Sequence, residues 1–288
     1  MILQKAERKN AKIKMALQGP SGSGKTYSAL LLAYGLCNEW SKIAVIDTEN
    51  HSSDLYAHLG QYNVLPISEP YAPEKYINAI QLCQAEGIEV IIIDSISHEW
   101  EGSGGILDIH GNMAGNSFAN WSKVTPRHNA FITAIIQSTA HVIGTIRTKQ
   151  DYVLADKNGK MVPEKVGLKG VTRDGMDYEF TLVFDLDIKH VASASKDRTG
   201  LFMDKIAHAI TFDDGMRIRQ WCLGGNIENQ ILSEIDLCKS VDELKSIYLK
   251  YPDHQRKLND KFFSKKEALQ SSEMKVSLSN VNPNGRAH

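Results

Sequence analysis

Short apolar runs alternate with amphipathic segments from about residue 12 to residue 222. The pattern predicts strands at residues 13–19, 42–47, 89–94 and 141–146, separated by helices at residues 25–40, 74–87 and roughly 116–138. A strand that is continuously apolar is typical of a parallel sheet with helices on both sides. The sequence therefore predicts an α/β protein with a mostly parallel central sheet flanked by helices.

The pattern changes after residue 148. Two short β-like runs surround Asn158-Gly159 within residues 152–162, which predicts a hairpin because this dipeptide favours a tight turn. Residues 180–196 are then typical of antiparallel sheet. Together these segments predict an antiparallel β extension of the core.

The C-terminal part differs again. Residues 226–271 have the pattern of two or three short helices, and residues 272–288 contain few apolar side chains. We expect a core over residues 1–225, a small helical segment over residues 226–271 and a flexible tail over residues 272–288.

The composition is that of a globular protein. The chain has 288 residues, of which 42% are hydrophobic and 23% charged, and its formal net charge of −1 gives no general attraction to nucleic acid. Four cysteines lack CxxC spacing, and His98-Glu99 lacks the second histidine of HExxH, so neither disulfides nor a zinc site are expected. Without a recognisable signal peptide or membrane span, we expect a cytoplasmic protein.

Residues 19–26 read GPSGSGKT and match the phosphate-loop pattern GxxxxGK[ST] between a predicted strand and a predicted helix. Glycines let backbone N–H groups surround phosphates, and the helix directs its positive end at the same anion. We expect Lys25 to neutralise β- and γ-phosphate charge and so to act in catalysis. The residues expected to bind ATP are Gly19, Pro20, Ser21, Gly22, Ser23, Gly24, Lys25, Thr26 and Tyr27. The alternative is a glycine-rich turn that binds no nucleotide.

A magnesium ion (Mg2+) normally accompanies ATP in such sites. The Thr26 hydroxyl is one expected ligand, and Asp94, which ends the apolar strand EVIIID, is the other. The alternative is that Asp94 or Ser95 only caps the following helix.

Two carboxylates, Asp47 and Glu49, follow another predicted strand. Ligands in open α/β sheets lie beyond the carboxyl ends of the strands, so the strands that end at Gly19, Asp47 and Asp94 are expected to meet at one nucleotide. Glu49 is then placed to polarise a water for attack on the γ-phosphate. The alternative is that Asp47 and Glu49 cap a helix near SSDLYAHL, residues 52–59.

These motifs, in this order, resemble the RecA recombinase family, and in particular the short phage RecA-like ATPases of the Sak single-strand-annealing group. The resemblance covers residues 12–222 and rests on GPSGSGKT, AVIDTEN followed by DLYAHLG, EVIIIDS, HVIGTIRTK and ASKDRTG. It implies a RecA-like P-loop core in which Glu49 is the catalytic base. Family members place a γ-phosphate-sensing glutamine where this chain has Thr145, with Arg147 and Lys149 close behind.

Lys196 and Arg198 lie two residues apart in a β-like run, so their side chains face the same way. The resemblance implies that such a KxR pair touches the γ-phosphate bound by the adjacent subunit and is therefore catalytic. It also implies a homo-oligomer, either a ring or a filament. The alternative is a solvated surface pair.

Two segments are candidates for mobile DNA-binding loops. Residues 97–121 are glycine-rich and carry Trp100, Phe118 and Trp121, and residues 148–178 carry six basic and five acidic side chains, a net charge of +1. Basic and aromatic side chains together suit single-stranded DNA, although the aromatic ones are also typical of a packed core.

The leading functional hypothesis is an ATPase that acts on single-stranded DNA in phage-type recombination or annealing, in a bacterial host's cytoplasm, with a recombination or single-strand-binding protein as a further partner. The alternatives are a hexameric helicase or repair motor, and an ATP-switched scaffold whose turnover does not respond to DNA. A small-molecule kinase is disfavoured because the chain lacks an arginine-rich lid segment.

Overall fold

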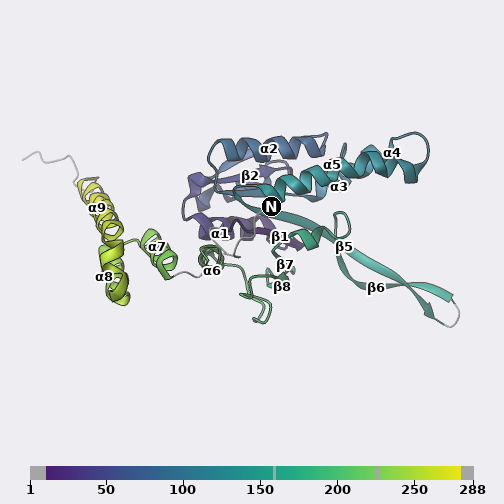
Figure 1. The fold of residues 1–288 in the computed structure, drawn as a ribbon. Coiled ribbons are helices and arrows are strands. Elements are labelled where there is room, and N and C mark those ends of the chain that lie inside the picture. The colour runs from purple at the N-terminus through teal and green to yellow at the C-terminus, as the bar shows by residue number, and fades with distance from the viewer. Residues whose placement is uncertain (1–10, 158–159, 225–226, 280–288) are drawn as a thin grey trace, which may run out of the picture. The chain divides into compact units, whose positions relative to one another are not determined.

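The computed structural model describes residues 11–157, 160–224 and 227–279 of the chain. Contacts divide it into two compact units, one spanning Lys12–Arg219 and the other beginning at Gln220. Figure 1 traces the elements of both units along the chain. Within the described ranges no helix is both long enough and apolar enough to cross a membrane.

The first unit is built on one sheet with the strand order β3-β2-β4-β5-β1-β7-β8. Neighbours from β3 to β7 are parallel, whereas β8 runs antiparallel to β7. The strands are β1 (Lys14–Gly19), β2 (Ile43–Asp47), β3 (Asn63–Pro66), β4 (Val90–Asp94), β5 (His141–Lys157), β7 (Leu182–Leu186) and β8 (Ala192–Asp197). The predicted α/β fold class, with a mostly parallel sheet and an antiparallel extension, is confirmed.

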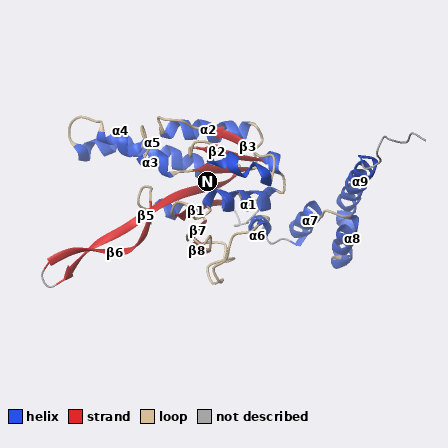
Figure 2. Cartoon of the chain, turned by 180° about the vertical axis from the view of Figure 1, so that it is seen from behind, coloured by secondary structure: helices blue, strands red, loops and turns tan. Residues whose placement is uncertain are grey.

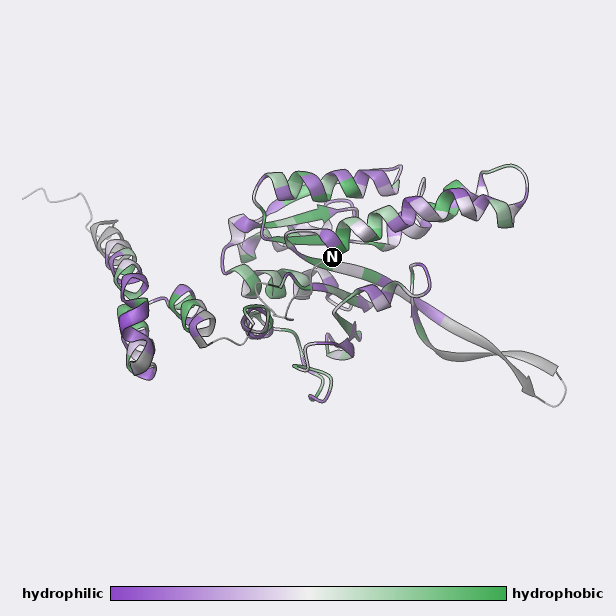
Figure 3. Ribbon diagram, in the orientation of Figure 1, coloured by the Kyte–Doolittle hydropathy of each residue, from purple (hydrophilic) through white to green (hydrophobic). Residues whose placement is uncertain are grey.

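Helices cover both faces of the sheet, as Figures 1 and 2 show. On one face, Ile91 and Ile93 of β4 belong to a core with Tyr76 of α2 (Pro73–Ala85) and Phe131 of α5 (Ser117–Gln137). Helix α1 (Lys25–Cys37) lies on the other face. Every residue of β2 and β4 is buried, which explains the uniformly apolar runs in the sequence and the green central strands of Figure 3.

The remaining helices of the first unit are short or terminal. They are η1 (Trp40–Lys42), η2 (Ser52–Leu59), α3 (Ser97–Glu101), α4 (Ile106–Gly111), η3 (Met176–Glu179) and α6 (Phe212–Cys222), the last of which extends into the second unit.

The two segments expected to be loops are largely regular. Residues 97–121, expected as one mobile loop, form α3, α4 and the start of α5. Strand β5 continues to Lys157, well past residue 146, and pairs with β6 (Lys160–Gly170) as an antiparallel hairpin in which Lys157 faces Lys160. The turn residues Asn158 and Gly159 lie outside the described ranges.

The second unit contains α7 (Ile227–Leu237), α8 (Val241–Lys250), η4 (Pro252–His254) and α9 (Gln255–Ser279). Ile231, Ile235, Leu244, Leu258 and Phe262 form its core. Helix α9 continues past residue 271, where a flexible tail was expected to begin.

Candidate nucleotide-binding site

The site forms where parallel strands end together. Asp47 pairs with Asp94 at the ends of β2 and β4, and Gly19, the end of β1, pairs with Arg147 inside β5, so these residues lie at one edge of the parallel part of the sheet. A cavity of about 560 Å³ opens at this edge. Its lining comprises Ser21, Gly22, Gly24, Lys25, Thr26, Glu49, Ser52, Tyr56, Asp94, Arg147, Thr148 and His190.

The loop between β1 and α1 has the backbone that an anion site needs. Gly22 and Gly24 have φ of 80° and 83°, a conformation that costs other residues energy, and a Cβ added at Gly24 would lie 3.0 Å from Nδ1 of His190. Helix α1 begins directly after Gly24 without a side-chain cap, which leaves its first N–H groups for a ligand. The loop residues therefore fit a phosphate chain.

Lys25 lies against the loop. Its Nζ donates hydrogen bonds to the carbonyl oxygens of Gly19 and Pro20, at 3.0 and 2.9 Å. Burial lowers the pKa of the Lys25 ammonium, while the nearby carboxylates of Asp94 and Glu49 oppose this effect. An anionic phosphate would further favour the charged lysine.

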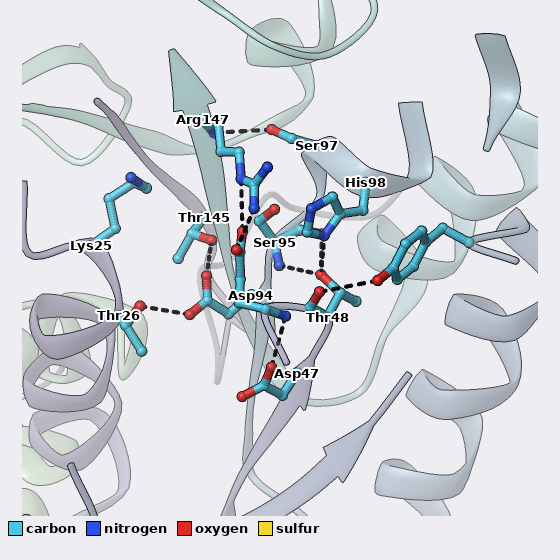
Figure 4. A network of polar contacts seen from close by, with 12 residues as sticks. Lys25, Thr26, Asp47, Thr48, Asp94, Ser95, Ser97, His98, Thr145 and Arg147 are labelled. Atoms are coloured by element: carbon cyan, nitrogen blue, oxygen red, sulfur yellow. Dashed lines mark hydrogen bonds and ion pairs between the residues drawn. The ribbon is translucent and has the colours of Figure 1, made fainter. Parts of the chain in front are cut away.

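Thr26 and Asp94 meet beside the loop (Figure 4). The Thr26 hydroxyl donates to Oδ2 of Asp94 at 2.6 Å, and the Thr145 hydroxyl donates to Oδ1 of the same carboxylate. Asp94 is 2% exposed, and burial raises the pKa of its carboxyl group while both hydroxyl donors oppose the shift. Hard oxygen donors of this kind fit Mg2+, which Thr26 and Asp94 would hold. When bound, the ion supplies positive charge to the phosphate oxygens.

Glu49 is held by an arginine that the sequence did not assign to the site. Nε of Arg147 donates to Oε1 of Glu49 at 2.8 Å, and a second guanidinium nitrogen donates to Oε2. Glu49 follows the end of β2, Arg147 lies inside β5, and both line the cavity. The bidentate pair places a carboxylate and a guanidinium beside the phosphate loop.

Asp47 has a different role from Glu49. Its Oδ1 accepts from the backbone N–H of Glu49 at 2.8 Å, and its Oδ2 accepts from the N–H of Ser53 in η2 at 3.0 Å. Asp47 thus caps the turn into η2, which is the alternative considered for both carboxylates. Only Glu49 of the two faces the cavity.

A buried polar network supports the end of β4. The Thr48 hydroxyl accepts from the N–H of Ser95 at 2.7 Å and lies 2.7 Å from Nδ1 of His98. His98 in turn stacks on Tyr71, with ring centroids 4.8 Å apart. These contacts fix the segment between Asp94 and α3, so they position the Asp94 carboxylate.

The other expected residues are divided between the cavity and its surroundings. Gly19 lies under the loop, where an added Cβ would lie 2.5 Å from the carbonyl oxygen of Leu186. The ring of Tyr27 packs against that of Tyr56, with centroids 5.6 Å apart. Pro20, Ser23 and Tyr27 do not line the cavity of the described chain.

Lys196 and Arg198 are not part of this cavity. Nζ of Lys196 donates to the carbonyl oxygens of Asp177 and Tyr178, at 2.8 and 2.6 Å, and Arg198 donates to Tyr178 at 3.3 Å. The two side chains do share one direction, but they are placed over η3 and not beside the phosphate loop of the same chain.

Five lining residues had no assigned role: Ser52, Tyr56, Arg147, Thr148 and His190. Ser52 and Tyr56 belong to the helical turn after Glu49, and His190 belongs to the β7–β8 connection. Position on a strand end was the available signal for Arg147, which follows HVIGTI directly.

A family model described as "AAA domain" matches residues 11–215, most of the chain. The chain belongs to the AAA domain family. As an AAA domain with a phosphate loop, it is a P-loop nucleotide-binding protein of the ATPase class, for which Mg2+ is the usual companion ion.

Among solved structures, the AAA domain is similar to a KaiC-like protein from the hyperthermophilic archaeon Pyrococcus horikoshii OT3. The alignment has 16% sequence identity and a TM-score of 0.38, and it covers 67% of this chain and 80% of that one. The search of curated proteins gives no matching sequence.

Proposed function

We propose that this protein is an ATPase that acts on single-stranded DNA, in recombination or annealing of the phage type. The observation that carries the proposal is the meeting of two segments far apart in the sequence. Trp100 and Trp121 lie with Lys149, Lys169 and Arg173 around a second cavity, of about 460 Å³, which we call the Trp–Lys cleft. These aromatic and basic residues come from the two segments that were candidates for DNA binding.

The aromatic wall of the Trp–Lys cleft is suited to bases. The Trp100 and Trp121 rings stack with centroids 6.1 Å apart, and His110 stacks on Trp121 at 4.1 Å. Both tryptophans are half-buried, so each is held by the protein while part of it faces the cleft. Stacking of an unpaired base on such a ring contributes roughly 1–3 kcal/mol and depends little on base identity.

The basic wall supplies charge for the DNA backbone. Lys149 is exposed, and Lys169 forms an ion pair with Asp174 at 2.8 Å. Phosphates attract cations at the surface and release counterions when they bind, which accounts for salt-sensitive affinity. Asp174 also lines the cleft, so its three basic residues and one acidic residue leave a net charge of +2 beside the rings, which suits a single strand.

Strand β5 connects the cleft with the nucleotide cavity. Arg147 and Thr148 line the nucleotide cavity, and Lys149, the next residue, lines the Trp–Lys cleft. The backbone is tied at this point, because the N–H of Val171 donates to the Arg147 carbonyl at 2.7 Å. A DNA strand bound at Lys149 can thus change the position of the Arg147 side chain, which holds Glu49. This gives a route by which DNA stimulates turnover.

In the proposed reaction Glu49 accepts a proton from the water whose oxygen bonds to the γ-phosphorus, while the bond from that phosphorus to the β–γ bridging oxygen breaks and ADP leaves. Lys25 and the loop N–H groups hold the phosphates, and Lys196 with Arg198 of a neighbouring subunit contribute further positive charge. The neighbour is required because these two side chains lie away from the cavity of their own chain. Such a cation supplied in trans is worth roughly 10³ to 10⁵ in rate.

The test is the rate of ATP hydrolysis by the full chain, with and without single-stranded DNA, across a series of salt concentrations. We expect stimulation by single strands that weakens steeply as salt rises. Directional unwinding of duplex DNA would favour the helicase alternative. Nucleotide-dependent oligomerisation with turnover that ignores DNA would favour the scaffold and overturn the proposal.

A further inference from the structure

The second unit carries an apolar groove that the nucleotide chemistry does not use. Helices α8 and α9 border a cavity of about 460 Å³, whose lining includes Leu244, Lys245, Tyr248, Phe262, Phe263 and Lys266. We call it the α8–α9 groove. It lies wholly within the unit that begins at Gln220.

Helical spacing explains why these side chains share the groove. Leu244, Lys245 and Tyr248 follow the i, i+1, i+4 spacing of one face of α8, and Phe262, Phe263 and Lys266 follow the same spacing on α9. Leu244 and Phe262 are buried and form the floor, and Tyr248 packs edge-on against Phe262 with centroids 5.0 Å apart. Each helix thus offers an apolar floor with a lysine beside it.

Phe263 presents an exposed ring at the edge of the groove. Its side chain is 60% exposed although the neighbouring Phe262 is only 6% exposed. A large exposed ring beside a recessed apolar floor is typical of an anchor for a bound segment, because burying it removes apolar surface from water.

The two lysines at the groove differ from the lysines that face α7. Lysines that face α7 are engaged there: Lys250 pairs with Glu234 at 3.1 Å, Lys257 pairs with Glu228 at 2.5 Å, and Lys265 donates to the Asp236 carbonyl at 2.7 Å. Lys245 and Lys266 have no ion pair with any carboxylate whose side chain the structure describes. The groove is therefore a cationic rim around an apolar floor.

We propose that the α8–α9 groove binds a short acidic segment of a partner protein, in which large apolar side chains are flanked by Asp or Glu. The apolar residues fill the floor against Leu244 and Phe263, and the carboxylates pair with Lys245 and Lys266. Single-stranded DNA fits less well, because its bases need exposed ring faces along a basic stripe, and the groove floor is recessed and partly aliphatic.

Two segments of this chain outside the described ranges do not complement this rim. Residues 1–10 carry Lys5, Arg8 and Lys9 against Glu7, and residues 280–288 carry Arg286 without an acidic residue. Both segments are thus basic, whereas the occupant has to be acidic to satisfy the two lysines.

The experiment selects peptides of about twelve residues from a random display library on the immobilised full chain, because recognition segments of this kind are short. We expect the recovered sequences to combine acidic residues with Leu, Ile, Phe or Trp. A synthetic copy of one recovered peptide, measured by fluorescence anisotropy, should bind about tenfold or more weakly to the Lys245→Glu/Lys266→Glu variant. The exposed-ring variant Phe263→Ala should lose a similar factor.

The matched control is Lys261→Glu, an exposed position on α9 that does not line the groove. This variant should keep the affinity within about twofold, since isolated surface charges contribute little. Circular dichroism melting shows whether each variant is folded, and Phe263→Ala changes a side chain that is 60% exposed.

Four outcomes overturn the proposal. One is a selection that yields basic or charge-neutral peptides, or none, and another is equal binding by the double lysine variant. The third is binding of a single-stranded oligonucleotide that is lost in the double variant, which assigns the groove to nucleic acid. The fourth is dissociation of an oligomer in sedimentation of Phe263→Ala, which assigns the groove to a second copy of this chain.

Discussion

Arg147 donates two hydrogen bonds to the carboxylate of Glu49, and both residues line the nucleotide cavity. Burial by itself raises the pKa of the Glu49 carboxyl group, but the hydrogen bond and charge of Arg147 outweigh it, so the pKa lies below its ordinary value. The carboxylate is therefore ionised, with both oxygens engaged. Each oxygen keeps a second lone pair, so in the proposed reaction Glu49 can accept a proton from water while Arg147 stays bound, and the pair lowers the basicity of the carboxylate.

The first prediction concerns Glu49→Gln. Glutamine has nearly the same shape and still accepts a hydrogen bond from Arg147, but it cannot take a proton. We expect nucleotide affinity to be retained and the turnover number to fall by roughly 10²- to 10⁴-fold, the usual contribution of a positioned base. Fluorescent-nucleotide binding and phosphate release measure the two effects separately. Glu86→Gln, an exposed carboxylate at the end of α2, is the control, and unchanged turnover in Glu49→Gln would remove Glu49 from the mechanism.

The second prediction follows from the direction of the Glu49 pKa. In Arg147→Met the guanidinium is lost and only the smaller effects of His98 and Ser95 still oppose burial, so the pKa of Glu49 rises. Since a base has to be unprotonated, the acidic limb of the turnover–pH profile should move to higher pH. Arg147→Lys keeps a positive charge and should shift the limb less. An unmoved limb in Arg147→Met would mean that Glu49 does not set the pH dependence.

Local sequence patterns were sufficient for the fold and for the phosphate loop. Strands β2 and β4 are buried on both faces, and a strand in this position needs apolar residues at nearly every position. Its sequence is therefore a continuous apolar run. The positive φ angles at Gly22 and Gly24 require glycine, so the phosphate-loop motif can be recognised from the local sequence alone.

The Glu49–Arg147 pair could not be predicted in the same way. The two residues are separated by 98 positions, and only the sheet register brings β2 and β5 to the same edge. The Trp–Lys cleft could not be predicted from local patterns either. Its two walls come from segments far apart in the sequence, the α3–α5 region and the β5–β6 hairpin with the residues that follow it. Asp47 also follows the pattern of an acidic residue at a strand end, but its carboxylate accepts hydrogen bonds from the turn that follows it and does not reach the cavity.

The third prediction tests whether DNA stacks on the rings that line the Trp–Lys cleft and not on any exposed ring of the same segment. Trp121→Ala removes a ring that lines the cleft, and we expect single-stranded DNA affinity to fall about tenfold, within the range of one lost stacking contact. Nucleotide affinity should not change. Phe118→Ala is the matched control, because Phe118 is 89% exposed in the same segment and does not line the cleft. Equal losses in both variants would argue against the cleft as the binding site.

The fourth prediction uses His141, whose Nδ1 accepts the backbone N–H of Ile13 at 3.1 Å. Burial lowers the pKa of His141 to about 3, so folding opposes protonation of the ring. Its contribution to stability is complete above the unfolded-state pKa of about 6.5 and is lost as pH falls from there towards 3, by about 1.4 kcal/mol per pH unit. Denaturant unfolding at several pH values measures this slope. His141→Asn keeps an acceptor without titrating, so its slope should be shallower by that amount, and identical slopes would contradict the prediction.

The last prediction tests whether Lys196 and Arg198 act on a neighbouring subunit. Lys25→Ala damages the phosphate site and leaves the Lys196–Arg198 pair intact, whereas Arg198→Ala does the reverse, so each variant alone should have little activity. In an equal mixture, about a quarter of randomly formed head-to-tail interfaces combine an intact phosphate site with an intact Lys196–Arg198 pair, and a corresponding share of turnover should return. Lys25→Ala mixed with Glu49→Gln is the control, because both changes lie on the same side of the interface and no interface in that mixture is whole. If the first mixture recovers no more activity than the second at any ratio, Lys196 and Arg198 serve only their observed contacts with the backbone of η3.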